Sequence, residues 1–402
     1  MAELGPVTCA GCGLLCDDVI VERSGDGVSL RPACARGAGW FSLRAARPPD
    51  APAATIDGQP ADVDTAVARA AELLRGARRP LVNGFDEATV EDARAAVTLA
   101  DRLGALVATE PSGRAWPGAP AVPLRGASTA TLGEIRDRSR VVVIWREDPE
   151  TTHPRLLDRL GFGVDSRSRL AVDRTLVVVD DRDTDTARRA DLHVRWPRDR
   201  DLEALTGLQV LQRRLTVRSS KIEAELGGVL ERINAVPHVA FVHGQGLAAG
   251  AGGQRRALAL HELVRELSRD RHVVTLSLPA ATGTRSAQDV LAWQTGYAGN
   301  IDLASGHPEL VTDTRPLPGV EGVDVWLTIE GAPGALPAGV SGIALCSLPV
   351  ESVDVSIRTA AAGVEAAGTA HRLDGIPLTL LAAQPAEAPT AAILLARLLE
   401  EI

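Results

Sequence analysis

Short, uninterrupted apolar runs separated by amphipathic segments constrain the fold of this 402-residue chain more than any other feature of its sequence. Residues 141–145 (VVVIW) and 176–179 (LVVV) are two such runs. A strand without apolar–polar alternation is typical of a parallel sheet that is buried on both faces. The other predicted elements are helices over residues 63–75, 90–103, most of 201–235 and 390–400, and strands at 80–83 and 105–108. This alternation of strand and helix predicts an α/β fold with parallel sheets.

A weak internal repeat divides this pattern into two related halves. Residues 79–84 (RPLVNG) and 237–244 (PHVAFVHG) each precede a long predicted helix. Residues 141–145 and 323–329 are each followed by a proline four positions later. We therefore expect two doubly wound, nucleotide-binding-like parallel-sheet halves.

A proline-rich joint at residues 47–52 (RPPDAP) separates the N-terminal segment from the rest of the chain. The domains expected from these features are a small Cys-rich head over residues 1–50, a first α/β half over 51–230 and a second over 231–402. The last of these ends in a segment rich in Ala, Gly and Pro.

Four of the five cysteines lie within the first 34 residues, at Cys9, Cys12, Cys16 and Cys34. Thiolates clustered this closely on a turn-rich segment predict a metal site, either an iron–sulfur cluster of four irons and four sulfurs or a zinc ion. Buried thiols and disulfides are the alternatives. A disulfide framework calls for secretion, and the N-terminus (MAELGPVTCAGC) has neither the basic start nor the apolar core of a signal peptide. The isolated Cys346 is expected to be a core thiol.

The overall composition narrows the class of partner. A net charge of −9 and a pI near 5.5 argue against nucleic acid or an anionic membrane surface. The chain has no apolar run approaching the ~20 residues that a membrane-spanning helix needs. We therefore expect a cytoplasmic globular protein.

Two loops that follow predicted strands are candidates for nucleotide binding, because ligands of such folds lie outside the carboxyl ends of the strands. In the first, Asp181 is placed to bind a ribose or a guanine edge, and Thr184 and Thr186 to hold phosphate. A capped turn that leads into a helix is the alternative for this loop. In the second, Gly244 and Gly246 would let the backbone approach a phosphate, although loop flexibility explains two glycines equally well.

Catalytic candidates are few. The chain lacks the GxSxG, HExxH and P-loop motifs. Glu110, Glu147 and Asp148 are candidate general acids, although charged side chains at strand ends are more often solvated. His153 is a candidate ligand or acid/base group, and a structural helix-start histidine is the alternative.

The ordered set of motifs resembles the formylmethanofuran dehydrogenase B-subunit family of the molybdopterin oxidoreductase superfamily. Residues 9–18 (CAGCGLLCDD) are similar to the cluster-binding head of that family. The resemblance continues in order through residues 131–134 (TLGE), 141–149, 153–155 (HPR), 181–191, 293–297 (WQTGY), 368–369 and 371–374 (HRLD). It implies a head domain on two nucleotide-binding-like α/β halves.

Three departures from the family pattern bear on function. The catalytic members of the family hold molybdenum or tungsten through a cysteine, but the corresponding residues 108–116 contain none, and Arg114 stands at that position. A guanidinium offers no lone pair to a metal. Trp40 replaces a lysine that links cluster and pterin, and Arg146 replaces a glycine beside the dinucleotide. Together these departures imply that the molybdenum or tungsten pterin is absent.

With these three departures, the chain resembles the B-subunit of a bacterial formyltransferase/hydrolase complex. That resemblance implies a role in tetrahydromethanopterin-linked oxidation of formaldehyde to formate. That route passes a formyl group to a methanofuran-like carrier and hydrolyses it on a zinc amidohydrolase subunit, without electron transfer. We therefore expect a redox-inactive scaffold that binds other subunits of the complex, with a metal that helps to fold the head.

Two alternatives remain at this point. One is an active molybdenum or tungsten formylmethanofuran dehydrogenase subunit with a bis-pterin guanine dinucleotide and an iron–sulfur cluster, in which Ser112 or Glu110 replaces the metal ligand. The other is a redox or nucleotide-binding protein of another kind.

Overall fold

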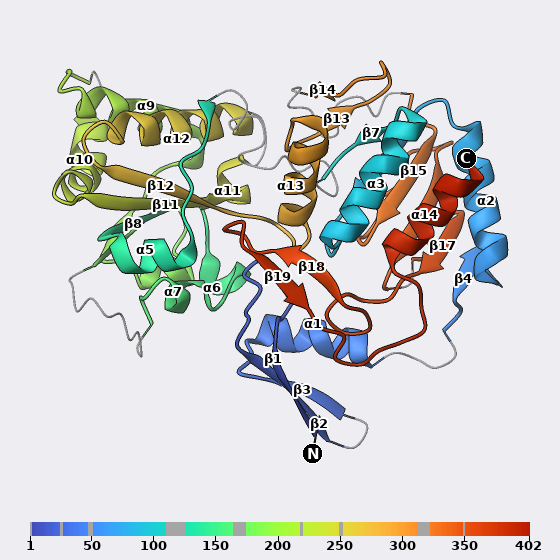
Figure 1. Ribbon diagram of the computed structural model, residues 1–402. Helices are drawn as coiled ribbons and strands as arrows, with labels where there is room; N and C mark the ends of the chain where they lie inside the picture. The colour runs from blue at the N-terminus through green and yellow to red at the C-terminus, as the bar shows by residue number, and fades with distance from the viewer. Residues whose placement is uncertain are drawn as a thin grey trace. The chain divides into compact units, whose positions relative to one another are not determined.

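The computed structural model describes residues 2–24, 27–46, 51–109, 125–163, 174–217, 220–248, 252–311, 322–348 and 350–402. The chain forms two compact units (Figure 1). Unit 1 comprises residues 1–114 and 280–402, and unit 2 comprises residues 115–279. Within the described residues, no helix combines the length and apolarity that a membrane crossing requires.

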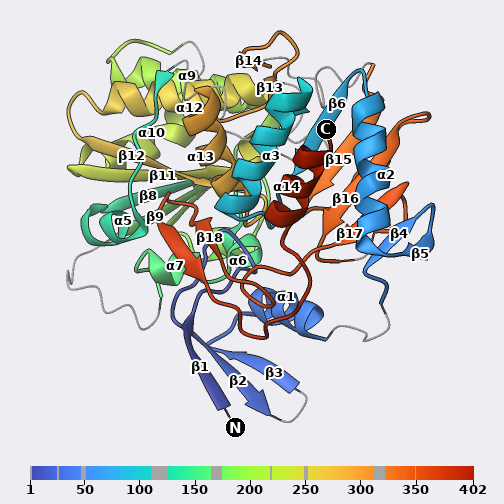
Figure 2. The ribbon, with the colours of Figure 1, turned by 45° about the vertical axis from the view of Figure 1, so that its right-hand side comes forward.

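Unit 1 is built on a nine-stranded sheet whose five central strands, β7-β6-β15-β16-β17, are all parallel. The strands in spatial order are β14 (Glu309–Leu310), β13 (Ile301–Asp302), β7 (Leu106–Val107), β6 (Pro80–Gly84), β15 (Val325–Ile329), β16 (Ser341–Cys346), β17 (Val355–Arg358), β4 (Ala54–Ile56) and β5 (Gln59–Ala61). The helices described in this unit are α1 (Ala35–Ala45), α2 (Val63–Gly76), α3 (Val90–Leu103), α13 (Thr284–Thr295) and α14 (Ala391–Glu401). Figure 2 shows α2, α3 and α14 side by side on one face of this sheet.

The helix ends of unit 1 follow from local sequence. Helix α3 begins with a capping box, in which the Thr89 hydroxyl accepts the Asp92 N–H and the Asp92 carboxylate accepts the Thr89 N–H. It ends at Gly104, which adopts the left-handed conformation that glycine tolerates. The other oxygen of Asp92 accepts the Ala392 N–H, so one side chain caps both α3 and α14.

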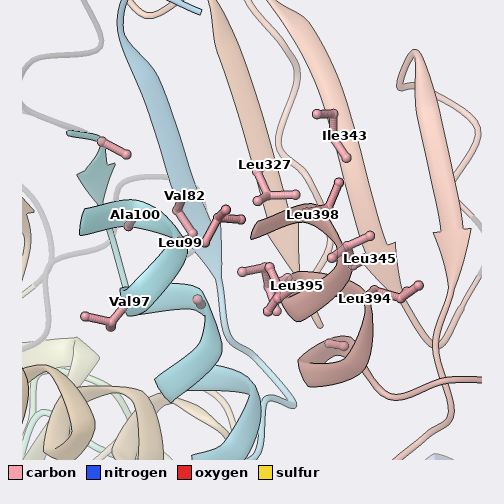
Figure 3. Close-up of a cluster of buried hydrophobic side chains, with 14 of the residues drawn as sticks. Val82, Val97, Leu99, Ala100, Leu327, Ile343, Leu345, Leu394, Leu395 and Leu398 are labelled. Carbon is pink, nitrogen blue, oxygen red and sulfur yellow. The ribbon is translucent and has the colours of Figure 1, made fainter. Parts of the chain in front are cut away.

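The apolar core of unit 1 lies between these helices and the parallel strands. Figure 3 shows side chains from both layers meeting there: Val82, Leu327, Ile343 and Leu345 from the strands, and Val97, Leu99, Ala100, Leu394, Leu395 and Leu398 from α3 and α14. Strands β6 and β15 are buried along their whole length, as strands of a parallel sheet covered on both faces are.

The N-terminal segment forms a separate antiparallel sheet within unit 1. This sheet consists of β1 (Ala2–Val7), β2 (Val19–Ser24) and β3 (Gly27–Arg31), and α1 (Ala35–Ala45) follows it. A hairpin of β18 (Gly368–His371) and β19 (Pro377–Leu380) contributes to the same apolar cluster as Ala10 and Leu15. The Leu373 N–H donates to the Gly13 carbonyl, which ties the cysteine loop to this hairpin.

Unit 2 is built on a five-stranded, fully parallel sheet. Its strands in spatial order are β10 (Leu192–Val194), β9 (Thr175–Val179), β8 (Val141–Trp145), β11 (His238–Gly244) and β12 (His272–Leu278). Its helices are α5 (Leu132–Arg138), α6 (Pro149–Thr152), α7 (Leu156–Arg159), α8 (Asp185–Arg188), the 3-10 helix η2 (Arg198–Arg200), α9 (Asp201–Gln212), α10 (Ser220–Asn234), α11 (Gln245–Ala248) and α12 (Gly253–Leu267). Side chains of α9, α10 and α12 pack on one face of the sheet.

The two parallel sheets have the same spatial plan with a permuted chain order. The order β7-β6-β15-β16-β17 in unit 1 corresponds to β12-β11-β8-β9-β10 in unit 2. The repeated segments predicted from the sequence occupy equivalent places, since β6 corresponds to β11 and β15 to β8. Strands β6 and β11 are the two copies of the first repeated segment, and β8 and β15 are the two copies of the second. In each sheet a copy of the first segment pairs with a copy of the second, β6 with β15 and β11 with β8.

This pairing divides the strands of residues 51–230 between two sheets. The bounds of units 1 and 2 therefore differ from the halves expected at 51–230 and 231–402, and residues 1–50 are included in unit 1. The physical reason is that a repeat in sequence does not specify which copies pair. Here the N-terminal copy of each segment, β6 or β8, pairs with the C-terminal copy of the other segment, β15 or β11.

Candidate functional site at the strand ends of unit 2

The loops after β8, β9 and β11 lie together at the carboxyl edge of the unit 2 sheet. Trp145 is in register with Val179 and His243, so the residues that follow these three strands are neighbours. The predicted nucleotide-site residues all lie at or just beyond the ends of β9 and β11: Asp181 and Thr184 in the loop before α8, Thr186 in α8, Gly244 at the end of β11 and Gly246 in α11. The structure thus brings both candidate loops to one edge, as the rule for ligand sites in open parallel sheets requires.

Arg146, the residue after β8, is the centre of this edge. Its backbone has a φ of 59° and its side chain is almost wholly buried. The guanidinium Nε donates to both carboxylate oxygens of Asp201, at 3.0 and 2.9 Å. One Nη donates to Asp181 at 3.0 Å and the other to the Trp196 carbonyl at 2.6 Å. All three nitrogens of the guanidinium therefore donate hydrogen bonds to other residues of the chain.

Asp201 is the buried counter-charge that sequence reasoning missed. It is the first residue of α9 and accepts a further hydrogen bond from the Trp145 indole N–H at 3.0 Å. A buried guanidinium requires both charge compensation and hydrogen bonds. An arginine directly after a buried apolar strand was the available signal, but 55 positions separate Arg146 from Asp201, and nothing local connects them.

Glu147 occupies the glycine loop that was predicted to approach phosphate. Its carboxylate accepts the Gly246 N–H at 2.6 Å. A Cβ at Gly244 would lie 2.7 Å from the Glu147 carboxyl carbon, and one at Gly246 would lie 1.7 Å from the Arg146 carbonyl oxygen. Both glycines are therefore needed to admit residues of the β8 loop. Burial raises the pKa of Glu147 to about 7, so this carboxyl titrates near neutrality.

The loop after β9 is also saturated by internal contacts. Arg182 donates to Asp180 from its backbone and its guanidinium and, against the effect of burial, lowers the pKa of that carboxyl. Thr184 is the N-cap of α8, which is the structural alternative considered above. The buried Thr186 hydroxyl donates to Asp148 at 2.5 Å and accepts the Glu150 N–H. Asp181 accepts a hydrogen bond from Arg146, as described above.

His153 and Cys346 have structural surroundings. The His153 ring contacts the Thr152 hydroxyl at 3.0 Å through Nδ1, and its backbone N–H closes the α6 turn on Pro149. Cys346 is buried in β16 and its thiol donates to the Gly331 carbonyl. Burial raises the pKa of this thiol, as expected for a core cysteine. The predicted positions Glu110, Ser112 and Arg114 lie outside the described residues.

The N-terminal cysteines come from two segments that meet at a close backbone contact. A Cβ at Gly11 would lie 2.9 Å from the Gly37 Cα, and one at Gly37 would lie 2.9 Å from the Cys9 sulfur and 3.7 Å from the Cys34 sulfur. The Cys9 N–H donates to the Cys16 carbonyl, which closes the C-x2-C-x3-C loop. Burial raises the pKa of Cys12 to about 12.

The structure forms no disulfide among the five cysteines, all of which lie in described segments. Within the described ranges, no group of three or more His, Cys, Asp and Glu side chains is placed to hold a metal ion. The metal site thus stays a prediction. Trp40, at the position of the family's lysine, donates its indole N–H to Glu87 at 3.0 Å, and Arg44 pairs with the same carboxylate.

The fold and the polar strand ends of the sheets define the class of protein. Acetylene hydratase from Pelobacter acetylenicus has a similar structure, with a TM-score of 0.56 and 13% identity over 98% of this chain and 68% of that chain. The chain thus has a mixed α/β fold with parallel sheets, similar to the fold of that acetylene hydratase.

More specific matches identify the relatives within that class. The chain is homologous to the formylmethanofuran dehydrogenase B-subunit, as the motifs predicted. It is 28% identical over 400 residues to the B-subunit of the tungsten-containing formylmethanofuran dehydrogenase 2 of Methanocaldococcus jannaschii. The match covers 93% of this chain and 92% of that protein. The B-subunit of the formyltransferase/hydrolase complex Fhc of Methylorubrum extorquens is 27% identical over 261 residues, covering 64% and 68%.

A solved structure agrees with these matches. A chain in the crystal structure of the formyltransferase/hydrolase complex FhcABCD from Methylorubrum extorquens with methylofuran has a TM-score of 0.71 and 23% identity, over 87% of this chain and 98% of that chain. No protein-family model matches the sequence.

Proposed function

We propose that this chain is a cytoplasmic, redox-inactive scaffold subunit of a formyltransferase/hydrolase complex that serves tetrahydromethanopterin-linked oxidation of formaldehyde to formate. It binds the other subunits of that complex, and the chemistry takes place on them. The homology to the B-subunits of Fhc and of formylmethanofuran dehydrogenase supports the assignment to such a complex.

The observation that carries the scaffold role is the buried Arg146–Asp201 pair at the strand ends of unit 2. A dinucleotide on this edge needs backbone without a side chain, and acidic groups that are available to its ribose or base. Here the residue after β8 is Arg146, and its guanidinium donates hydrogen bonds to both Asp201 and Asp181. Opening the edge would break a buried ion pair, at a cost of about 3–5 kcal/mol.

The second part of the proposal is that Cys9, Cys12, Cys16 and Cys34 hold an iron–sulfur cluster or a zinc ion in a structural role. The close Gly11–Gly37 contact supports this, because it brings the sulfurs of Cys9 and Cys34 against the same turn. Thiolates are the donors that both groups prefer. A bound metal would supply folding free energy to a small head, and no redox step is assigned to it.

Elemental analysis of the anaerobically purified complex tests the function. We expect the tagged wild-type chain to co-purify with its partner subunits and to contain no stoichiometric molybdenum or tungsten. The iron or zinc content should fall when Cys12 and Cys16 are replaced by serine, and should not change in a matched Cys346→Ser variant.

Two outcomes would contradict the proposal. Stoichiometric molybdenum or tungsten would make the chain an active dehydrogenase subunit with an unexpected ligand. A complex that retains full formyl transfer and hydrolysis, and full assembly, after removal of this chain would contradict the scaffold role.

A further inference from the structure

Basic and imidazole side chains form a row at the amino edge of the unit 2 sheet, the edge opposite the candidate site. Thr175, Val141 and Val239 are in register on β9, β8 and β11, so the residues that precede them are neighbours. His238, which precedes Val239, is in register with His272 on β12. Across the four strands the row is Arg174, Arg140, His238 and His272.

Helix α5, which leads into β8, adds two arginines beside this row. Burial lowers the pKa of His238, and the positive charge of Arg138 lowers it further. A Cβ at Gly161 would lie 2.6 Å from a terminal nitrogen of Arg174 and 3.3 Å from the Arg136 side chain, so these two side chains lie close together. The six residues together are called the amino-edge patch: Arg136, Arg138, Arg140, Arg174, His238 and His272.

Positive charge exceeds negative charge in the amino-edge patch. Its acidic neighbours on α5 are Glu134, at 3.5 Å from Arg138 and 3.7 Å from His272, and Asp137, at 2.8 Å from Arg136. With neutral histidines, four arginines and these two carboxylates leave two positive charges uncompensated. The sign is opposite to that of the whole chain, whose net charge is −9.

Arg140 and Arg174 carry this uncompensated charge. Within the described part of the chain, no carboxylate forms an ion pair with Arg140. Arg174 donates to a neutral acceptor, the Leu160 carbonyl, at 2.5 Å. Burial lowers the pKa of Arg174, and the like charges of Arg140 and Arg136 lower it further, against the effect of Asp137. An anion from outside the chain would therefore relieve repulsion between these arginines.

The amino-edge patch is open to solvent and has an extended shape. The side chains of Arg138, His272 and Arg136 are 62%, 51% and 47% exposed. Neighbouring strands lie about 4.8 Å apart, so the row of four side chains spans about 14 Å. In an extended peptide, alternate side chains lie about 6.8 Å apart on one side, so three carboxylates at alternate positions span the same distance.

We propose that the amino-edge patch docks an acidic, extended segment of another protein subunit through the carboxylates of that segment. The inference rests on the proposed function, because a scaffold must offer binding surfaces to its partners, and it assigns one of them. Docking of this kind depends on charge complementarity and weakens as salt screens the charges.

Binding of a defined acidic peptide tests the surface directly. The probe is a fluorescein-labelled peptide with three glutamates at alternate positions, titrated with the full-length chain in 50 mM NaCl and followed by fluorescence anisotropy. We expect the wild-type chain to bind it, and Arg138→Glu/Arg140→Glu to weaken binding about tenfold or more. The control Arg69→Glu/Arg255→Glu makes the same change in net charge at exposed positions on α2 and α12 and should alter the Kd less than about twofold.

Three results would overturn the docking surface. One is an equal loss of binding in the two double variants. Another is competition by inorganic phosphate that exceeds the effect of sodium chloride at equal ionic strength, and the third is an oligothymidylate with three phosphates that binds as tightly as the peptide. If the charge-reversed chain does not fold, Arg140→Gln/His272→Gln replaces it. This neutral variant should weaken peptide binding about threefold or more, and unchanged binding would overturn the proposal.

Co-purification separates this inference from the proposed function. Loss of a partner subunit from Arg138→Glu/Arg140→Glu, in a buffer in which the control variant retains it, supports the docking surface. A charge-reversed chain that retains every partner at each salt concentration overturns the surface and leaves the scaffold role intact. A wild-type chain that binds the peptide but retains no partner contradicts the scaffold role and supports the acidic-segment surface.

Discussion

Replacement of Arg146 by methionine should destabilise unit 2 more than any comparable surface change. The substitution leaves the Asp201 carboxylate, which is fully buried, without its cation, and removes three hydrogen bonds to that carboxylate. Removing one partner of a buried ion pair costs about 3–5 kcal/mol. The Trp145 indole N–H remains as the only hydrogen-bond donor to the Asp201 carboxylate among the described residues, which places the expected loss in that range.

A double-mutant cycle isolates the pair from other effects of the substitution. Asp201→Leu alone leaves the buried guanidinium with hydrogen bonds to Asp181 and to the Trp196 carbonyl and with Asp180 at 3.9 Å, and should still cost several kcal/mol, because its bidentate partner is lost. The double variant Arg146→Met/Asp201→Leu should be much less destabilised than the sum, because apolar side chains of similar size replace a buried pair at little cost. We expect a coupling of about 3 kcal/mol or more, at the upper end of what contacting residues show.

Urea unfolding followed by tryptophan fluorescence measures these values. Trp145 and Trp196 are both fully buried beside the pair, so they report unfolding of unit 2. Arg69→Met is the control, since Arg69 and Glu72 form an exposed pair worth less than about 1 kcal/mol. Single variants within 1 kcal/mol of wild type, or strictly additive effects, would refute the view that this pair closes the strand edge.

Three further predictions concern stability. Burial lowers the pKa of His243 to about 3 in the folded chain, so on acidification the unfolded chain binds a proton at this histidine before the folded chain does. The free energy of unfolding therefore falls as the pH drops below about 6.5, the pKa of an unperturbed histidine. His243→Phe should remove about 2 kcal/mol of the loss in stability between pH 7.5 and 5, measured as a change in urea midpoint. An unchanged pH dependence would argue against this cause. Gly246→Ala should prevent folding or cost several kcal/mol, because its Cβ would overlap the Arg146 carbonyl oxygen. Gly227→Ala is the control: no atom lies within 4 Å of its Cβ position, so this variant should be neutral or stabilising by up to about 1 kcal/mol in thermal unfolding. Thr89→Ala should cost about 1–2 kcal/mol through loss of the α3 cap, and serine at that position should restore most of it, as judged by the urea midpoint; equal losses with alanine and serine would count against the cap.

Local sequence patterns predicted the secondary structure closely. The helix expected at residues 90–103 is α3, and the closing helix expected at 390–400 is α14 with Thr390 as its cap. The strand expected at 141–145 is β8. These elements depend on apolar periodicity and on side chains within three or four residues of a helix end, and both can be read from neighbouring positions.

The candidate site was predicted only in part. The residues after β9 and β11 were selected because polar side chains and glycines follow buried strands, and the structure places them on one edge. Their partners were not predictable, because Arg146 meets Asp201 only once the tertiary fold brings the first residue of α9 within hydrogen-bond distance of the residue after β8. Likewise, phosphate approach and loop flexibility were the two explanations considered for the glycines at 244 and 246, whereas the structure places Glu147 and the Arg146 carbonyl against them.

By itself, the sequence determined that this protein forms parallel sheets covered by helices, that four of its cysteines lie within the first 34 residues, and that it resembles the B-subunit of formylmethanofuran dehydrogenase. Periodicity, capping and motif spacing are all properties of short segments. The tertiary structure alone decided which strands share a sheet and which charges become buried together. Strand pairing joins segments far apart in the chain, here in a permuted order, and the contacts of a buried side chain depend on that order rather than on its sequence neighbours.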